Sequence, residues 1–114
     1  MSIDPAALEV YREIMGDEMD AFIADILKNF YTNVRDLIAS LDKTLAENDV
    51  EGFTRAAHTL KTTTATVGAR RVSSLAIDLE ARGGTEPLPD LLPLLSELKE
   101  AYEEAEIKLK ELYD

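Results

Sequence analysis

Apolar residues recur every three or four positions along residues 17–46, and this period constrains the fold more than any other feature of the chain. It keeps one apolar stripe along one side of a helix over roughly eight turns of 3.6 residues. The stripe consists of Met19, Phe22, Ile23, Ile26, Phe30, Val34, Leu37, Ile38, Leu41 and Leu45. A strand would instead alternate apolar and polar residues, and the sequence has no such run bounded by hairpin turns. The sequence therefore predicts an all-α protein with one long helix.

A short helix is predicted before the long one, and a capping motif follows it. The short helix begins with Asp4 as its N-cap and Pro5 at its first position, and it ends at Gly16. We expect it to cover one end of the protein. Asn48 and Glu51 have the spacing of a capping box, which predicts that a third helix starts there.

Three helices are expected in the second half of the chain. The third ends at Gly68, the fourth covers about 69–82 before the Gly83-Gly84 pair, and the fifth starts around Pro89. Their predicted buried faces are Phe53, Ala57, Leu60, Thr64 and Val67; then Val72, Leu75, Ala76 and Leu79; then Leu91, Leu95, Leu98, Tyr102, Ala105, Leu109 and Leu112. Short connections favour antiparallel neighbours. The expected fold is an antiparallel up-and-down four-helix bundle with a short N-terminal capping helix.

Length and composition indicate one domain over residues 1–114. A chain of 114 residues with 46% hydrophobic content suits a single compact core. It has no cysteine, which excludes disulfides and thiolate metal sites and suits a reducing compartment. No apolar run approaches the roughly 18 residues of a membrane span, and residues 1–18 lack the pattern of a signal peptide. We therefore expect a monomeric, cytoplasmic protein.

The charge of the chain is unevenly distributed. The net charge is −11, from 23 acidic and 12 basic side chains. Such an excess repels nucleic acid and anionic membranes, so a protein partner is expected instead. Residues 54–77 nevertheless hold four basic side chains and no acidic one. This basic stretch contains His58, the only histidine, and such surroundings suit a phosphoryl group.

The position of His58 on its helix predicts an exposed ring. At 3.6 residues per turn it projects about 140° away from the centre of the buried stripe. Arg55 and Lys61 lie three residues before and after it, and three small residues share its side of the helix: Thr54, Thr62 and Ala65. The cations disfavour the imidazolium and leave a ring nitrogen free to act as a nucleophile. They can also stabilise a phosphoryl group on that nitrogen, and the small neighbours leave room for another protein to approach.

Glu80 is a candidate for orienting the ring of His58. The chain rises roughly 15 Å from His58 to Gly68 and returns about the same distance along the next helix to Glu80, at 1.5 Å per residue. A carboxylate at that height can accept a hydrogen bond from Nδ1–H and leave Nε2 free.

The residues around His58 resemble a known signature. The run from His58 to Gly68, HTLKTTTATVG, followed by Leu75 and by Leu79-Glu80, is similar to that of histidine-containing phosphotransfer (HPt) domains of multistep two-component relays. One departure is Thr62, where the family often has Gly. The similarity is specific over about 30 residues, and the helix order fits the whole chain.

The resemblance implies a four-helix bundle that relays phosphate without kinase activity of its own. His58 would accept a phosphoryl group from a receiver-domain aspartate and pass it to another receiver, with Lys61 stabilising the group. The expected partners are response-regulator receiver domains and a hybrid sensor kinase. The chain itself would bind no cofactor or metal, because Mg²⁺ belongs to the receiver in that family.

Three other functions are weighed against this one. A di-iron or haem bundle needs further ligands, and the chain has a single histidine. A sensor-kinase dimerisation domain usually has an acidic residue directly after its histidine, whereas Thr59 follows His58, and no ATP-binding domain is recognisable. The remaining alternative is a helical interaction module that docks partners without carrying phosphate. Phosphorylation of His58 distinguishes a phosphorelay intermediate from such an interaction module.

Overall fold

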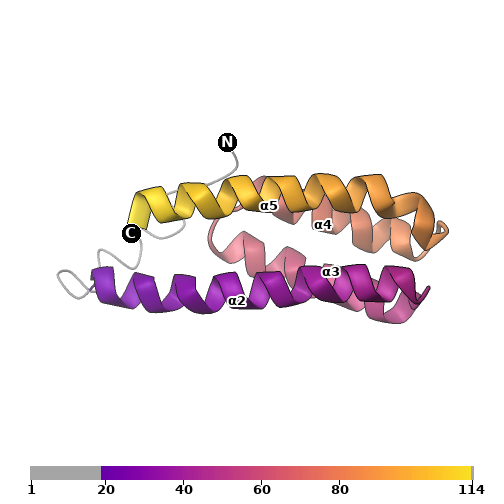
Figure 1. Cartoon of the computed structure of the whole chain (residues 1–114), viewed down its shortest axis with the longest axis horizontal. Helices are drawn as coiled ribbons and strands as arrows, with labels where there is room; N and C mark the ends of the chain where they lie inside the picture. Colours follow the sequence, from indigo (N-terminus) through magenta and orange to yellow (C-terminus); the bar gives the residue numbers. More distant parts are fainter. Residues whose placement is uncertain (1–18, 114) are drawn as a thin grey trace.

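The computed structural model describes residues 19–113, which fold as an all-helical domain of four α-helices and one 3₁₀ helix, with no strand among those residues. The elements are α2 (Met19–Ala46), α3 (Val50–Thr66), α4 (Arg70–Gly83), the 3₁₀ helix η2 (Leu88–Leu91) and α5 (Leu92–Tyr113). Figure 1 shows the four α-helices side by side with their long axes in one direction. Each packs against the next, and α2 also contacts α5. The helix predicted from Asp4 to Gly16 lies outside the described residues.

The core confirms most of the predicted apolar faces. All five residues predicted for the buried face of α3 are buried, as are all four predicted for α4. The predicted stripes missed several buried residues, among them Leu27 on α2, Ala56 on α3, Ser73 on α4 and Ala101 on α5. The prediction for Leu112 was wrong: this residue is 41% exposed near the end of α5.

The turn between α2 and α3 corrects the predicted capping box. The N-cap of α3 is Asp49 instead of Asn48, and its carboxylate accepts a hydrogen bond of 3.0 Å from the backbone N–H of Gly52. Asn48 has a φ of 55°, a left-handed conformation that asparagine tolerates and that ends α2. The backbone N–H of Asp49 then donates to Thr44, which closes the last turn of α2. A residue that ends one helix in this conformation leaves its neighbour to cap the next.

The turn between α3 and α4 depends on Gly68, as predicted. Gly68 is buried and has a φ of 77°, which a residue with a Cβ rarely adopts. The backbone N–H groups of Gly68 and Ala69 donate to Ala65 and Thr64, so the final carbonyls of α3 are satisfied. The chain therefore reverses within three residues, and α4 returns directly along α3.

The ends of the last two helices differ slightly from prediction. α4 extends through Gly83, which is buried because its backbone packs against Phe53 of α3. Pro89 lies in η2, and α5 begins only at Leu92. The two buried leucines of η2, Leu88 and Leu91, attach this segment to the core.

Two exposed ion pairs join α2 to α5. Arg35 contacts Glu106 at 2.6 Å, and Lys99 contacts Asp42 at 2.6 Å. Both pairs lie on the side of α2 away from α3, so the surface that carries His58 takes no part in them. Within residues 19–113, no helix is long and apolar enough to cross a membrane.

Candidate functional site

His58 lies in the middle of α3 with its ring directed away from the core. Its side chain is 58% exposed, whereas Ala57 and Leu60 beside it are fully buried. The predicted exposure is therefore confirmed. The buried face of α3 holds the helix against its neighbours, and this packing fixes the direction in which His58 points.

Glu80 of α4 contacts the ring of His58. The Oε2 atom of Glu80 lies 2.8 Å from Nδ1 of His58. An ionised carboxylate can only accept, so Nδ1 carries the proton in this contact and the lone pair of the neutral ring is on Nε2. The turn at Gly68 brings Glu80 to this height, because α4 runs back along α3 from there. The contact thus orients an exposed imidazole through Nδ1.

Lys61 contacts the other oxygen of the same carboxylate. Its Nζ atom lies 3.0 Å from Oε1 of Glu80, and the two side chains are 29% and 31% exposed. The hydrogen bond from Lys61 is the main reason why the pKa of Glu80 lies below its usual value; partial burial opposes this, and the hydrogen bond from His58 adds to it. The hydroxyl of Ser73 on α4 also donates to the backbone carbonyl of Lys61 at 3.0 Å. Lys61 is therefore held to α4 by both its main chain and its side chain.

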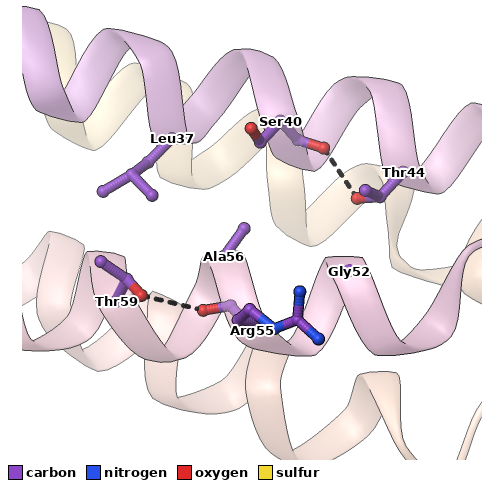
Figure 2. A pocket seen from close by; sticks show the side chains of 7 residues that line it. All are labelled: Leu37, Ser40, Thr44, Gly52, Arg55, Ala56 and Thr59. Carbon is purple, nitrogen blue, oxygen red and sulfur yellow. Dashed lines mark hydrogen bonds between the residues drawn. The ribbon is translucent and has the colours of Figure 1, made fainter.

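Arg55 lies on the opposite side of His58 from Lys61. It pairs with Glu51 one turn earlier on α3 at 2.7 Å, and both side chains are exposed. Figure 2 shows Arg55 beside a hollow between α2 and α3 that is lined by Leu37, Ser40, Thr44, Gly52, Arg55, Ala56 and Thr59. The hydroxyls of Thr44 and Thr59 donate to carbonyls of their own helices, so those hydrogens are already used. The hollow therefore has few hydrogen-bond donors available for an anion. Arg55 lies at the edge of the side of α3 that carries His58.

The three small residues predicted beside His58 lie around it on α3. Thr54 and Ala65 are on the side nearer α4, and Thr62 is on the side nearer α2, as the helical period requires. The hydroxyl of Thr54 donates to Val50, and that of Thr62 donates to the carbonyl of His58 at 3.3 Å. Ala65 is exposed. Besides the two cations, Leu60 is the only large side chain of α3 within one turn of His58, and it is buried.

Two ion pairs of the site were not predicted from the sequence. The first is the pair between Lys61 and Glu80, which depends on the angle between two helices and leaves no signal in the sequence. The second is the pair between Arg55 and Glu51, whose spacing of four residues on one helix could have indicated it. Among residues 19–113, no group of three or more His, Cys, Asp or Glu side chains could hold a metal ion.

Comparison with protein families identifies the domain. The model of the Hpt domain family matches residues 25–107, a range that contains His58, Lys61 and Glu80. The chain belongs to the Hpt family. Hpt domains act in phosphorelays as histidine phosphotransfer intermediates that work with receiver domains, so this is the role of the chain.

A solved structure shows the same fold. Histidine-containing phosphotransfer protein B (HptB) from Pseudomonas aeruginosa PAO1 is similar with a TM-score of 0.80 and 22% sequence identity, over 98% of this chain and 94% of that one. Comparison with curated protein sequences finds no match. The Hpt domain therefore shares the overall fold of HptB, although most of its residues differ.

Proposed function

We propose that Nε2 of His58 carries the phosphoryl group of this Hpt domain. The observation that supports this most directly is the contact between Nδ1 of His58 and Glu80, which leaves Nε2 as the nucleophilic nitrogen of an exposed ring. A ring held in one tautomer and one direction is prepared for attack without further rearrangement. Glu80 is thus a positioning residue.

The transfer proceeds by exchange of one bond to phosphorus. The Nε2 lone pair attacks the phosphorus of an aspartyl phosphate on a receiver domain, the P–O bond to the aspartyl group breaks, and the aspartate leaves with the electron pair. The product ring carries phosphorus on Nε2 and hydrogen on Nδ1, and it is positively charged. The carboxylate of Glu80 stabilises that charge through its hydrogen bond. Transfer to a second receiver reverses these steps, because the N–P electrons return to Nε2.

Five further residues are assigned by their positions around His58. Lys61 stabilises the phosphoryl oxygens, because its ammonium lies beside the ring on the shared carboxylate. Thr54, Arg55, Thr62 and Ala65 form the surface on which the receiver docks. These four are exposed or half-buried on the side of α3 that carries His58. Thr54, Thr62 and Ala65 are small, which allows a partner's active-site loops to reach the ring.

The partners and setting follow from the same role. We assign response-regulator receiver domains as donor and acceptor, and a hybrid sensor kinase with a receiver domain as a further partner. Mg²⁺ assists transfer from its place on the receiver, and the chain binds no cofactor. The bundle is monomeric and cytoplasmic, and its short turns support the antiparallel up-and-down order.

The experiment that tests this proposal is transfer of label from a panel of phosphorylated receiver domains to the purified chain. Label should appear on the wild-type chain and be lost again when an unphosphorylated receiver is added. It should be absent from a His58→Gln variant. Radiolabelled ATP with Mg²⁺ alone should label neither chain, since no nucleotide-binding motif is recognisable in the sequence. Labelling of His58 by ATP alone would overturn the relay proposal.

The alternative is a bundle that binds receivers without carrying phosphate. It predicts that receivers bind the wild-type chain and His58→Gln equally well while neither chain takes up label from any phosphorylated receiver.

A further inference from the structure

The carboxylate of Glu80 holds the ring and the ammonium that the proposed function assigns to the same phosphoryl group. Its Oε2 atom contacts Nδ1 of His58 at 2.8 Å and its Oε1 atom contacts Nζ of Lys61 at 3.0 Å. Both oxygens are bonded to the same carboxyl carbon, so the ring and the ammonium that contact them lie side by side. Any dianion added to the ring therefore arrives near an ammonium that already has a partner.

Lys61 is restrained in this position but is not enclosed. Its side chain is 29% exposed, and Ser73 holds only its backbone carbonyl, so the side chain remains partly open to solvent. Within the described part of the chain, Arg55 is the other cation next to His58 on α3, and it pairs with Glu51 on the far side. Lys61 is therefore the cation best placed to change partners when His58 is modified.

We infer that Lys61 is shared between Glu80 and the phosphoryl group of phosphorylated His58, so that Glu80 limits how strongly the phosphoryl group is held. The inference rests on the proposed function and concerns the regulation of the same site. When the ammonium turns to the phosphoryl oxygens, its contact with Oε1 weakens, and the freed carboxylate faces a dianion of like charge. Both effects oppose the stabilisation that Lys61 supplies.

Such an arrangement suits a carrier. A phosphoryl group bound by an uncommitted lysine would gain the whole interaction and would be harder to pass on. With Glu80 in competition, the ring remains oriented through Nδ1 while the phosphoryl group stays ready for transfer. One carboxylate thus prepares the nucleophile and keeps its product labile.

The test is a double-mutant cycle on Lys61 and Glu80, read from the phosphoryl group itself. Phosphoramidate, a small phosphoryl donor, would be used to modify His58 in four chains: wild type, Lys61→Met, Glu80→Gln and the double variant. A ³¹P NMR titration of each then gives the acid dissociation constant of the phosphoryl group, which rises when an ammonium binds the dianion. The cycle cancels the direct effect of Glu80→Gln on the ring.

We expect Lys61→Met to lower this constant more in the Glu80→Gln chain than in the wild-type chain. The difference should be about two- to fivefold, the range that one exposed ion pair supplies. Equal effects in the two chains would show that Lys61 is not shared. A smaller effect in Glu80→Gln would show that Glu80 delivers Lys61 to the phosphoryl group. Either result overturns the inference.

Glu51→Gln is the matched control. It removes the same charge from a carboxylate on α3 that pairs with Arg55, so the effect of Lys61→Met should be as small in that chain as in the wild type. Far-ultraviolet circular dichroism of each variant checks that the bundle is folded.

The outcome also separates this inference from the proposed function, since phosphoramidate needs no partner protein. If phosphoramidate leaves His58 unmodified, Nε2 is not available and both ideas are wrong. If His58 is modified and the cycle shows coupling but no receiver exchanges the group, only the proposed function is wrong.

Discussion

Nδ1 of His58 and Oε2 of Glu80 are 2.8 Å apart although the two residues are 22 positions apart in the chain. The contact joins the middle of α3 to the last part of α4, and the side chain of His58 remains 58% exposed. It decides which nitrogen of the neutral ring carries the proton, because a carboxylate accepts only from a protonated nitrogen, and the lone pair is then on Nε2.

The first prediction is therefore the position of the phosphoryl group. Phosphorylated His58 should carry phosphorus on Nε2 and hydrogen on Nδ1, because Glu80 occupies the Nδ1 side. Two-dimensional ¹⁵N–¹H NMR of the ring, with ³¹P coupling, distinguishes the two isomers. Phosphorus on Nδ1 would mean that the contact with Glu80 breaks before transfer.

The second prediction concerns His58→Gln. This variant should accept no stable phosphoryl group, while its free energy of unfolding stays within about 1 kcal/mol of the wild type, because the residue is largely exposed. Label from phosphorylated receivers and urea unfolding measure the two effects. Acid-labile, alkali-stable label on His58→Gln would place the phosphorylated residue elsewhere.

The third prediction concerns acidification. The pKa of Glu80 is lowered in the folded protein, first by the hydrogen bond from Lys61 and to a smaller extent by that from His58. Because this pKa is lower in the folded protein than in the unfolded chain, ionised Glu80 stabilises the fold at pH values above its unfolded pKa of about 4.3. That contribution is lost as the pH falls through the pKa of Glu80 in the folded protein. A carboxyl ¹³C NMR titration should find the midpoint of Glu80 below the ordinary range.

Lys61→Met is the matched variant for that titration. It removes the largest cause of the shift, so the midpoint of Glu80 should move up toward the ordinary range while the contact with His58 remains. A midpoint that stays where it was would show that Lys61 does not interact with Glu80 in solution.

The fourth prediction maps the docking surface with a pair of substitutions. Ala65→Arg should weaken receiver binding about tenfold or more, equivalent to ~1.4 kcal/mol, because it places a long side chain two turns from His58 on the same side of α3. Ala39→Arg is the control. Ala39 is also exposed, but it shares a side of α2 with Arg35 and Asp42, which pair with α5.

Receiver titrations of both variants check this assignment. Ala39→Arg should bind like the wild type, within about twofold, since a charge on the far side changes only the long-range field. Equal binding by Ala65→Arg and the wild type would move the interface to another side of the bundle.

The fifth prediction tests the packing of α4 on α3. A Cβ atom on Gly83 would lie 2.9 Å from Cδ1 of Phe53, which is closer than packed carbon atoms approach. The close contact in Gly83→Ala should lower the free energy of unfolding by about 1–3 kcal/mol. The better helix propensity of Ala offsets up to about 1 kcal/mol of this loss. Gly84→Ala should change it by less than about 1 kcal/mol, because its nearest neighbour would be 3.9 Å away and its φ of −86° suits any residue. Equal losses in the two variants would contradict the close contact.

Local signals predicted helix boundaries less well than helix faces. The period of three and four residues placed most of the buried side chains, because burial depends mainly on which side of the helix a residue occupies. The prediction of a capping box at Asn48 was wrong, because the sequence does not distinguish a residue that caps the following helix from one that ends the preceding helix. Asn48 takes the left-handed conformation, and capping passes to Asp49.

By itself, the sequence determined the all-helical class, the buried faces, the exposure of His58 and the family resemblance, all of which depend on residue type and on spacing along one helix. Only the tertiary structure decided that Glu80 contacts both His58 and Lys61. Helical period gives the direction of a side chain relative to its own axis. The distance between side chains of two helices depends also on how closely the helices pack and at what angle, and in this protein that packing is set by contacts such as Gly83 on Phe53.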